Sequence, residues 1–244
     1  MQCESWTWSH TRLPAPARVM RWGHYGIPVL LFPSAGGDFD EVERFHLVGA
    51  VAELIERGRI KVFSVDGIAP RTWLRGVDSP GHCAHIQAGH DEFINDEVVP
   101  LIRKDCHSDD IQILAAGSAL GAHSAVSALC RNPENFRAAI ALSGLFDLSQ
   151  YLPAGYVPDL YWTSPLYYLP GLPEADARLH TLRNRFIQLA TGAGEYERPG
   201  ESHRLAHVLR SRGIPHHLDD WGNGFSHRWT TWRDMLPRFL AANL

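Results

Sequence analysis

The residues most suggestive of chemistry form a glycine-framed turn in the segment 111–122, where Gly117 and Gly121 flank a central Ala119. Glycine two residues before and after a central residue is the frame of a nucleophile elbow, the abrupt strand-to-helix turn that holds a reactive serine at strained backbone angles. An apolar strand is expected before this frame and a helix after it. Because the methyl group of Ala119 cannot attack a carbonyl, the sequence predicts the geometry of the elbow without its nucleophile.

A nucleophilic site also needs a base, which in this chain order follows the last strand, with an acid before it. His227 lies in the glycine-containing segment 221–229, between the final predicted strand and the final predicted helix. The acid should follow the preceding strand, where Glu195 and Glu197 both occur. A buried carboxylate there would hold one ring nitrogen of His227 and stabilise the imidazolium. Position alone leaves both glutamates open.

Hydrolysis of an ester further requires two backbone N–H groups that face the developing oxyanion. The residue after the nucleophile position, Leu120, is expected to supply one. The second should come from the small-residue segment 33–37, with Ala35 as the first candidate and Gly36 as the next. Small residues there would let the backbone approach a ligand, although a plain glycine turn is the alternative interpretation.

Aromatic residues in the irregular segments, or beside His227, could form an acyl pocket. Trp73, Trp162 and Phe225 are the predicted substrate-binding residues among them. Trp229 and Trp232, three residues apart at the start of the last helix, are expected to be core.

Residues 82–90 contain a cysteine and three histidines that resemble metal ligands, namely His82, Cys83, His85 and His90. No second cluster at a fitting spacing would complete a zinc site, so we expect a polar segment and no metal. No other feature of the sequence implies a cofactor.

These side chains must be positioned by an alternation of short apolar runs with segments of helical spacing. Buried strands are predicted at 28–33, 60–66, 111–116, 136–143, 186–191 and 216–220, and helices at 40–57, 90–106, 119–131, 202–212 and 230–242. An antiparallel edge strand is predicted at 12–21, and irregular site walls at 68–89 and 147–176. The pattern predicts a single α/β domain over residues 1–244, with a doubly wound, mostly parallel sheet and helices on both faces.

Composition narrows the class of protein. The chain has 244 residues, 45% of them hydrophobic, and a formal net charge of −4 without a long basic run, which argues against a nucleic-acid or membrane surface. Neither a signal peptide nor a membrane span is recognisable, and the four cysteines are widely spaced, so we expect a cytoplasmic protein with free thiols. A small-molecule ligand is the expected partner, and the oligomeric state is left open.

Taken together, the residues resemble the "putative esterase" family of the α/β-hydrolase superfamily, which includes esterase D-like enzymes and, more distantly, the antigen 85 mycolyltransferases. The resemblance covers most of the chain and is carried by the segments 32–37, 64–66, 117–121, 140–144, 164–165, 194–197 and 221–227. It implies an α/β-hydrolase fold, ester or acyl hydrolysis and no cofactor. The register of the family's Gly-Glu-x-acid segment points to Glu197 as the acid. Serine is the family's residue where this chain has Ala119.

Three interpretations of Ala119 follow. The native residue at this position could be serine, so that this chain is an inactivated form of a serine-type hydrolase. The chain could instead be a natural pseudo-hydrolase that binds an acyl ligand without cleaving it. The third interpretation is a reaction in which His227 acts as a base with no covalent intermediate. Ser118 is a residual nucleophile candidate, and acyl transfer would use the same machinery as hydrolysis.

Overall fold

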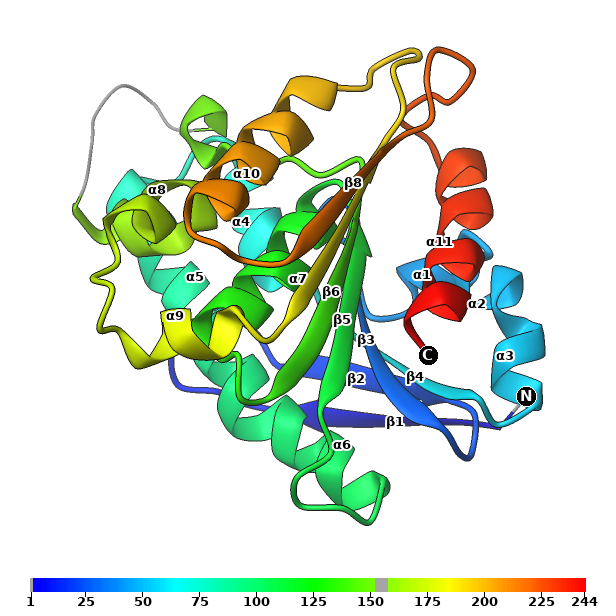
Figure 1. The fold of residues 1–244 in the computed structure, drawn as a ribbon. Coiled ribbons are helices and arrows are strands. Elements are labelled where there is room, and N and C mark those ends of the chain that lie inside the picture. Colours follow the sequence, from blue (N-terminus) through cyan, green and yellow to red (C-terminus); the bar gives the residue numbers. More distant parts are fainter. Residues whose placement is uncertain (1, 152–157) are drawn as a thin grey trace.

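The computed structural model describes residues 2–151 and 158–244, which form one eight-stranded sheet with helices on both faces (Figure 1). The strands are β1 (Cys3–Trp8), β2 (Ala17–Trp22), β3 (Ile27–Phe32), β4 (Ile60–Val65), β5 (Ile113–Ser118), β6 (Phe136–Leu142), β7 (Phe186–Thr191) and β8 (His216–Asp220). Their order is β1-β2-β4-β3-β5-β6-β7-β8, in which β2 is antiparallel to β1 and to β4 and all other neighbours are parallel. The predicted doubly wound, mostly parallel sheet is confirmed.

The helices cover the two faces of the sheet unequally (Figure 1). One face carries α1 (Glu41–Arg44), α2 (Leu47–Ala50), α3 (Ala52–Glu56) and α11 (Trp229–Asn243). The other carries α4 (Ile68–Arg75), α5 (Pro80–Phe93), α6 (Val99–Asp105), α7 (Leu120–Arg131), α8 (Pro165–Tyr168), α9 (Ala177–Leu182) and α10 (Pro199–Ser211). A π-helical turn at Ile94–Val98 joins α5 to α6, and 3₁₀ turns lie at Leu148–Tyr151, Pro158–Thr163 and Leu169–Gly171.

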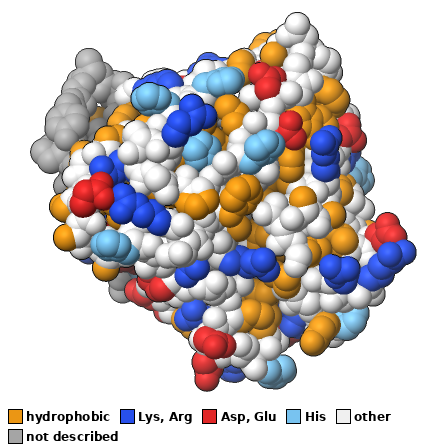
Figure 2. All heavy atoms as spheres, in the orientation of Figure 1, with side chains coloured by type: hydrophobic (Ala, Val, Ile, Leu, Met, Phe, Trp, Pro, Cys, Tyr) orange, Lys and Arg blue, Asp and Glu red, His pale blue; other side chains and the backbone are white. Residues whose placement is uncertain are grey.

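Alternate side chains of the central strands enter two separate hydrophobic cores. On β3, Leu30 and Phe32 belong to the core on the side of the sheet that α5 and α7 cover. Val29 and Leu31 belong to the core on the side that α11 covers. Burial on both faces explains why these strands are continuous apolar runs rather than alternating ones. Figure 2 shows basic and acidic side chains interspersed over the face in view.

Several predicted boundaries agree with the structure, and several are wrong. The predicted strands at 186–191 and 216–220 have the bounds of β7 and β8. The strand predicted at the edge, 12–21, is the antiparallel β2, but β1 pairs with its outer side and forms that edge. The predicted helix 40–57 is three short helices, since His46 adopts a left-handed φ of 62° between the first two.

The stretch predicted as irregular at 68–89 is helical, and this prediction is wrong. It contains α4 and most of α5. The Ser79 hydroxyl accepts a hydrogen bond from the His82 N–H, and Pro80 occupies the first helical position. Both are ordinary signals of a helix N-terminus. Among the described residues, no helix is long and apolar enough to cross a membrane.

Candidate active site

Ala119 lies at the turn between β5 and α7 with a strained backbone. Its φ is 53° and its ψ is −119°, in a region that L-residues rarely adopt, and its side chain is buried. The two framing glycines are needed for space: a Cβ on Gly117 would lie 2.3 Å from the carbonyl oxygen of Gly121, and one on Gly121 would lie 2.4 Å from that of Phe32. The backbone therefore has the form of a nucleophile elbow with a methyl group at its apex.

His227 and Glu197 come together beside this turn, from the loops after β8 and β7. The Nδ1 atom of His227 lies 3.7 Å from Oε2 of Glu197, and the Glu197 side chain is 1% exposed. This separation is too long for a hydrogen bond, and among the described residues the buried Nδ1 has no other partner. Catalytic hydrogen bonds are often long without a ligand and shorten when one binds. The pair is thus close enough to form a base with its orienting carboxylate.

Ser143 contacts the Glu197 carboxylate, and Trp232 contacts the His227 imidazole. The Ser143 hydroxyl donates to Glu197 Oε1 at 2.6 Å and accepts from the Trp232 indole N–H at 3.0 Å. The Trp232 ring also packs edge-on against the His227 ring, with centroids 5.0 Å apart. The Ala119 N–H donates to the carbonyl of Leu142, directly before Ser143, so the elbow and the Glu197–His227 pair meet at the end of β6.

Glu195, the other candidate acid, has a different environment. Its side chain is 58% exposed and pairs with Arg228 at 2.8 Å. It contacts His227 only through the backbone, where its carbonyl accepts the His227 N–H. The geometry therefore favours Glu197 over Glu195 as the carboxylate that faces the imidazole.

The predicted oxyanion donors are not both free in this structure. The N–H of Leu120 donates to the carbonyl oxygen of Ser34 at 2.9 Å, and the N–H of Gly121 lies 3.3 Å from the same oxygen. Ser34 is held in turn by the buried carboxylate of Glu41, which accepts its N–H at 2.8 Å. Burial raises the pKa of Glu41 above its ordinary value despite this bond. Ala35, which follows Ser34, is exposed.

The three aromatic residues predicted to bind substrate lie in different places. Trp73 is 2% exposed and packs in a small cluster with Leu120. Phe225 packs edge-on against Trp221 and accepts the Gly194 N–H with its carbonyl, in the loop that carries His227. Trp162 is 45% exposed and lines a separate hollow of about 300 Å³ with Arg131 and other residues. Of the three, Trp73 clusters with Leu120 of the elbow and Phe225 lies near His227 in sequence, whereas Trp162 lines the separate hollow.

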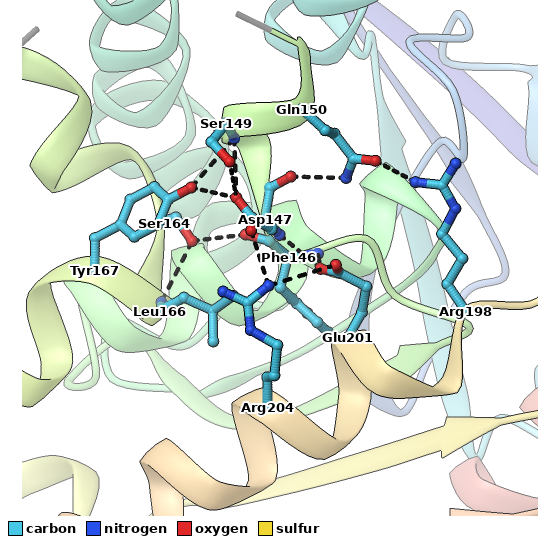
Figure 3. Close-up of polar contacts among 10 residues, drawn as sticks. All are labelled: Phe146, Asp147, Ser149, Gln150, Ser164, Leu166, Tyr167, Arg198, Glu201 and Arg204. Atoms are coloured by element: carbon cyan, nitrogen blue, oxygen red, sulfur yellow. Dashed lines mark hydrogen bonds and ion pairs between the residues drawn. The ribbon is translucent and has the colours of Figure 1, made fainter. Parts of the chain in front are cut away.

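A polar cluster fixes the loop after β6 to α10 (Figure 3). The Asp147 carboxylate accepts hydrogen bonds from the Ser149 N–H and hydroxyl, the Tyr167 hydroxyl and Arg204. Although burial acts to raise it, these donors hold the pKa of Asp147 well below its ordinary value. Glu201 accepts the Asp147 N–H at 2.7 Å. The anchored loop includes Leu145, whose N–H donates to the carbonyl of Ala119.

Two contributors to this site were not recognised as such from the sequence. Ser143 lies in segment 140–144, which contributes to the family resemblance, but no role in the site was predicted for it; it directly follows β6. Trp232 was expected only to be core; it is 4% exposed, as expected, but it also contacts His227. Within the described residues, no group of three or more His, Cys, Asp or Glu side chains could hold a metal ion. His90 instead lies 3.2 Å from the carbonyl oxygen of Asp66.

Comparison with known proteins gives a family and a fold. A family model described as "Putative esterase" matches residues 20–242. No curated protein sequence matches. Similar solved structures include a ferulic acid esterase, at 18% identity, a TM-score of 0.71 and coverage of 98% of this chain and 96% of that one.

Two further structures are similar over nearly their whole length. An S-formylglutathione hydrolase from Agrobacterium tumefaciens has 13% identity and a TM-score of 0.71, with 98% of this chain and 93% of that one covered. MPT51 (FbpC1) from Mycobacterium tuberculosis has 15% identity and a TM-score of 0.73, with 99% and 97% covered. At such identities the likeness shows the fold, which is that of the α/β-hydrolases.

Proposed function

This chain belongs to the esterase family whose model matches residues 20–242, and on that premise we propose that its reaction centre is that of a serine-type ester or acyl hydrolase in which Ala119 occupies the nucleophile position. The observation that supports this most is the strained backbone of Ala119, at φ 53° and ψ −119°. Such strain persists only where the surroundings impose it, and it clusters at functional sites. The carboxylate–histidine pair of Glu197 and His227 is near: Ser143, which bonds Glu197, directly follows Leu142, whose carbonyl accepts the Ala119 N–H.

A serine at position 119 would complete the chemistry. Its hydroxyl would attack the ester carbonyl while His227 accepted the proton, and Glu197 would hold the Nδ1–H and stabilise the imidazolium. His227 would then donate the proton to the leaving alcohol, which leaves the acyl group bound to the serine. Water would attack this acyl group while His227 took its proton, and His227 would return a proton to the serine oxygen. The Leu120 and Ala35 N–H groups are the proposed oxyanion donors, once Leu120 is released from the Ser34 carbonyl.

With alanine at this position, the first step has no nucleophile. Removal of a catalytic serine lowers turnover by roughly a millionfold while binding survives. We therefore propose that the chain as it stands binds a small ester or acyl ligand and leaves it intact. Both an inactivated hydrolase and a natural pseudo-hydrolase would behave in this way, whereas a His227-based reaction without a covalent intermediate would still turn over.

The test is Ala119→Ser, assayed beside the unaltered chain with an activated short-chain ester and a fluorophosphonate label. We expect turnover and labelling of the serine variant alone. Ala119→Ser combined with His227→Ala is the matched control, and it should lose both. A serine variant that folds but neither turns over nor labels contradicts the proposal. Activity of the unaltered chain that His227→Ala abolishes would instead support the reaction without a covalent intermediate.

A further inference from the structure

A second hollow, of about 500 Å³, lies at the carboxyl edge of β4, beside the Pro33–Gly37 loop. Its charged lining consists of Arg18, Arg71, Arg75 and Asp66, with Ile68 and the Pro14–Pro16 segment completing the walls. Thr72 also lines the hollow, and its hydroxyl donates to the Ile68 carbonyl. Three guanidinium groups thus face one carboxylate.

The one carboxylate is already neutralised. Asp66 accepts the Arg18 N–H at 2.8 Å, two hydrogen bonds from the Arg18 guanidinium and the Phe39 N–H at 3.0 Å. The Arg18 guanidinium also lies 4.3 Å from the centre of the Phe39 ring, so it is fixed on both sides. The remaining positive charge of the hollow is that of Arg71 and Arg75.

Of these two arginines, Arg71 has no anionic partner among the described residues, and Arg75 is ion-paired with Asp78 at long range. Arg71 donates its Nε–H to the Gly36 carbonyl at 2.8 Å, and its other two nitrogens bond to none of the described residues. Arg75 is 64% exposed and lies 3.7 Å from Asp78, outside hydrogen-bond distance. The hollow therefore presents a net positive surface with open donors.

The hollow and the elbow border the same loop. A Cβ on Gly36 would lie 2.4 Å from the Arg71 backbone nitrogen, so α4 packs directly on this loop. Two residues earlier in the loop, the Ser34 carbonyl accepts the Leu120 N–H beside Ala119. A group bound by Arg71 is therefore connected, through the Gly36 backbone, to the Pro33–Gly37 loop, which contains the proposed oxyanion donor Ala35.

The topology gives the separation of the strands on which the two places border. Arg18 is on β2, and β4 and β3 separate β2 from β5, which leads to Ala119. Three interstrand spacings amount to about 14 Å. A ligand that reached both places would therefore carry its ester and its second group at opposite ends of a medium-length chain.

We propose that this hollow binds an anionic group, a carboxylate or phosphate, at the far end of the ester ligand. This inference rests on the proposed function and names its substrate class: an ester whose acyl part ends in an anion. Guanidinium groups match both anions because their paired N–H groups reach two oxygens at once. The acyl chain would cross the Pro33–Gly37 loop between the two places.

Because the unaltered chain should not cleave esters, their binding to it can be measured directly. The probes are p-nitrophenyl monoesters of dicarboxylic acids of increasing chain length, each compared by calorimetric titration with the neutral monocarboxylic ester of equal length. We expect the carboxylate-terminated ester to bind more tightly, with the largest advantage at intermediate length. Equal affinity of charged and neutral esters at every length overturns the inference.

Variants at Arg75 make the test specific. Arg75→Gln should weaken binding of the charged ester about two- to fivefold, the range of an exposed charge pair, and leave the neutral ester unaffected. Asp78→Asn, which removes the carboxylate paired with Arg75, should tighten binding of the charged ester. The matched control is Arg57→Gln, at a 71% exposed arginine directly after α3, which should change nothing. An identical response to Arg57→Gln and Arg75→Gln would contradict the site.

Two further measurements separate this inference from the proposed function. If Ala119→Ser hydrolyses neutral esters but gains nothing from a terminal carboxylate, the function stands and the anion site fails. If Ala119→Ser turns over no ester while Arg75→Gln still weakens binding of the charged ester, the function fails and the anion site stands. Inorganic phosphate serves as the probe of a free anion, and tight binding of phosphate with no dependence on ester length overturns the assignment to the ester ligand.

Discussion

Ser143 donates its hydroxyl to Glu197 across 54 residues of sequence, at 2.6 Å, from a backbone in the left-handed region with φ 48°. The same hydroxyl accepts the indole N–H of Trp232, which packs on the His227 ring. One hydroxyl therefore sets the position of the carboxylate and of the tryptophan on either side of the imidazole. Its unusual backbone conformation is what aims it there.

The first prediction concerns Ser143→Ala. It leaves a buried carboxylate oxygen and a buried indole N–H without this partner, so the free energy of unfolding should fall by about 1–3 kcal/mol. Urea unfolding measures this. In the Ala119→Ser background, kcat should fall as well, because the Glu197 carboxylate loses a hydrogen bond that orients it. The exposed Ser211→Ala is the matched control; an effect no larger than that of Ser211→Ala would contradict the role of Ser143.

The second prediction concerns the strain at the elbow. Ala119→Gly removes the Cβ from a residue at φ 53°, which relieves roughly 1–3 kcal/mol of strain and costs roughly 0.5–1 kcal/mol in chain entropy. The variant should therefore be as stable as the parent or more stable. Ala125→Gly, in the middle of α7, should instead lose about 1 kcal/mol. Equal losses for the two variants, measured by urea unfolding, would show that position 119 is unstrained.

The third prediction concerns the Leu120 N–H, which the Ser34 carbonyl now accepts. After Ala119→Ser is labelled with a fluorophosphonate, the phosphonyl oxygen should take this N–H, because an anionic oxygen is the stronger acceptor. A crystal structure of the labelled variant should show the Ser34 carbonyl beyond hydrogen-bond distance from Leu120. A labelled structure that keeps the 2.9 Å contact would remove Leu120 from the oxyanion site.

The fourth prediction concerns His123, which lies one turn into α7. Burial lowers its pKa to about 4, below the value of about 6.5 in an unfolded chain. Between these values the unfolded chain takes up a proton that the folded chain does not, so stability falls as pH falls. The His123 contribution should be about 2 kcal/mol between pH 6.5 and pH 5. Urea unfolding of His123→Gln should show a shallower pH dependence than the parent, while the exposed His85→Gln should not differ from it.

The sequence was informative where structure depends on nearby residues. Gly117 and Gly121 predict the strained turn at Ala119 because the steric need for glycine is local. The apolar runs that became β7 and β8 are bounded by turns, and their bounds agree with the structure. Position in the chain order singled out His227 as a candidate base, which stays a prediction; its Nδ1 lies 3.7 Å from Oε2 of Glu197.

What could not be predicted depends on contacts between distant segments. The bond from Trp232 to Ser143 joins residues 89 positions apart, and no local pattern marks it. The Ser34 carbonyl at Leu120 likewise joins the loop after β3 to the start of α7. The edge strand β1 had a signal that was missed: Trp6 and Trp8 alternate with polar residues and are partly buried. Similarly, Ser79 and Pro80 are a local signal for a helix start, but the proline and glycine content of the stretch 68–89 predicts irregular structure instead.

The close contacts of Gly117, Gly121 and Phe32 around the elbow are made by backbone atoms and do not involve the side chain of the residue at its apex. The shape of the turn therefore does not depend on which small side chain occupies position 119. Alanine codons (GCN) and the TCN codons of serine differ in their first base alone. A single nucleotide change would therefore place a hydroxyl at the apex of a turn that is already formed.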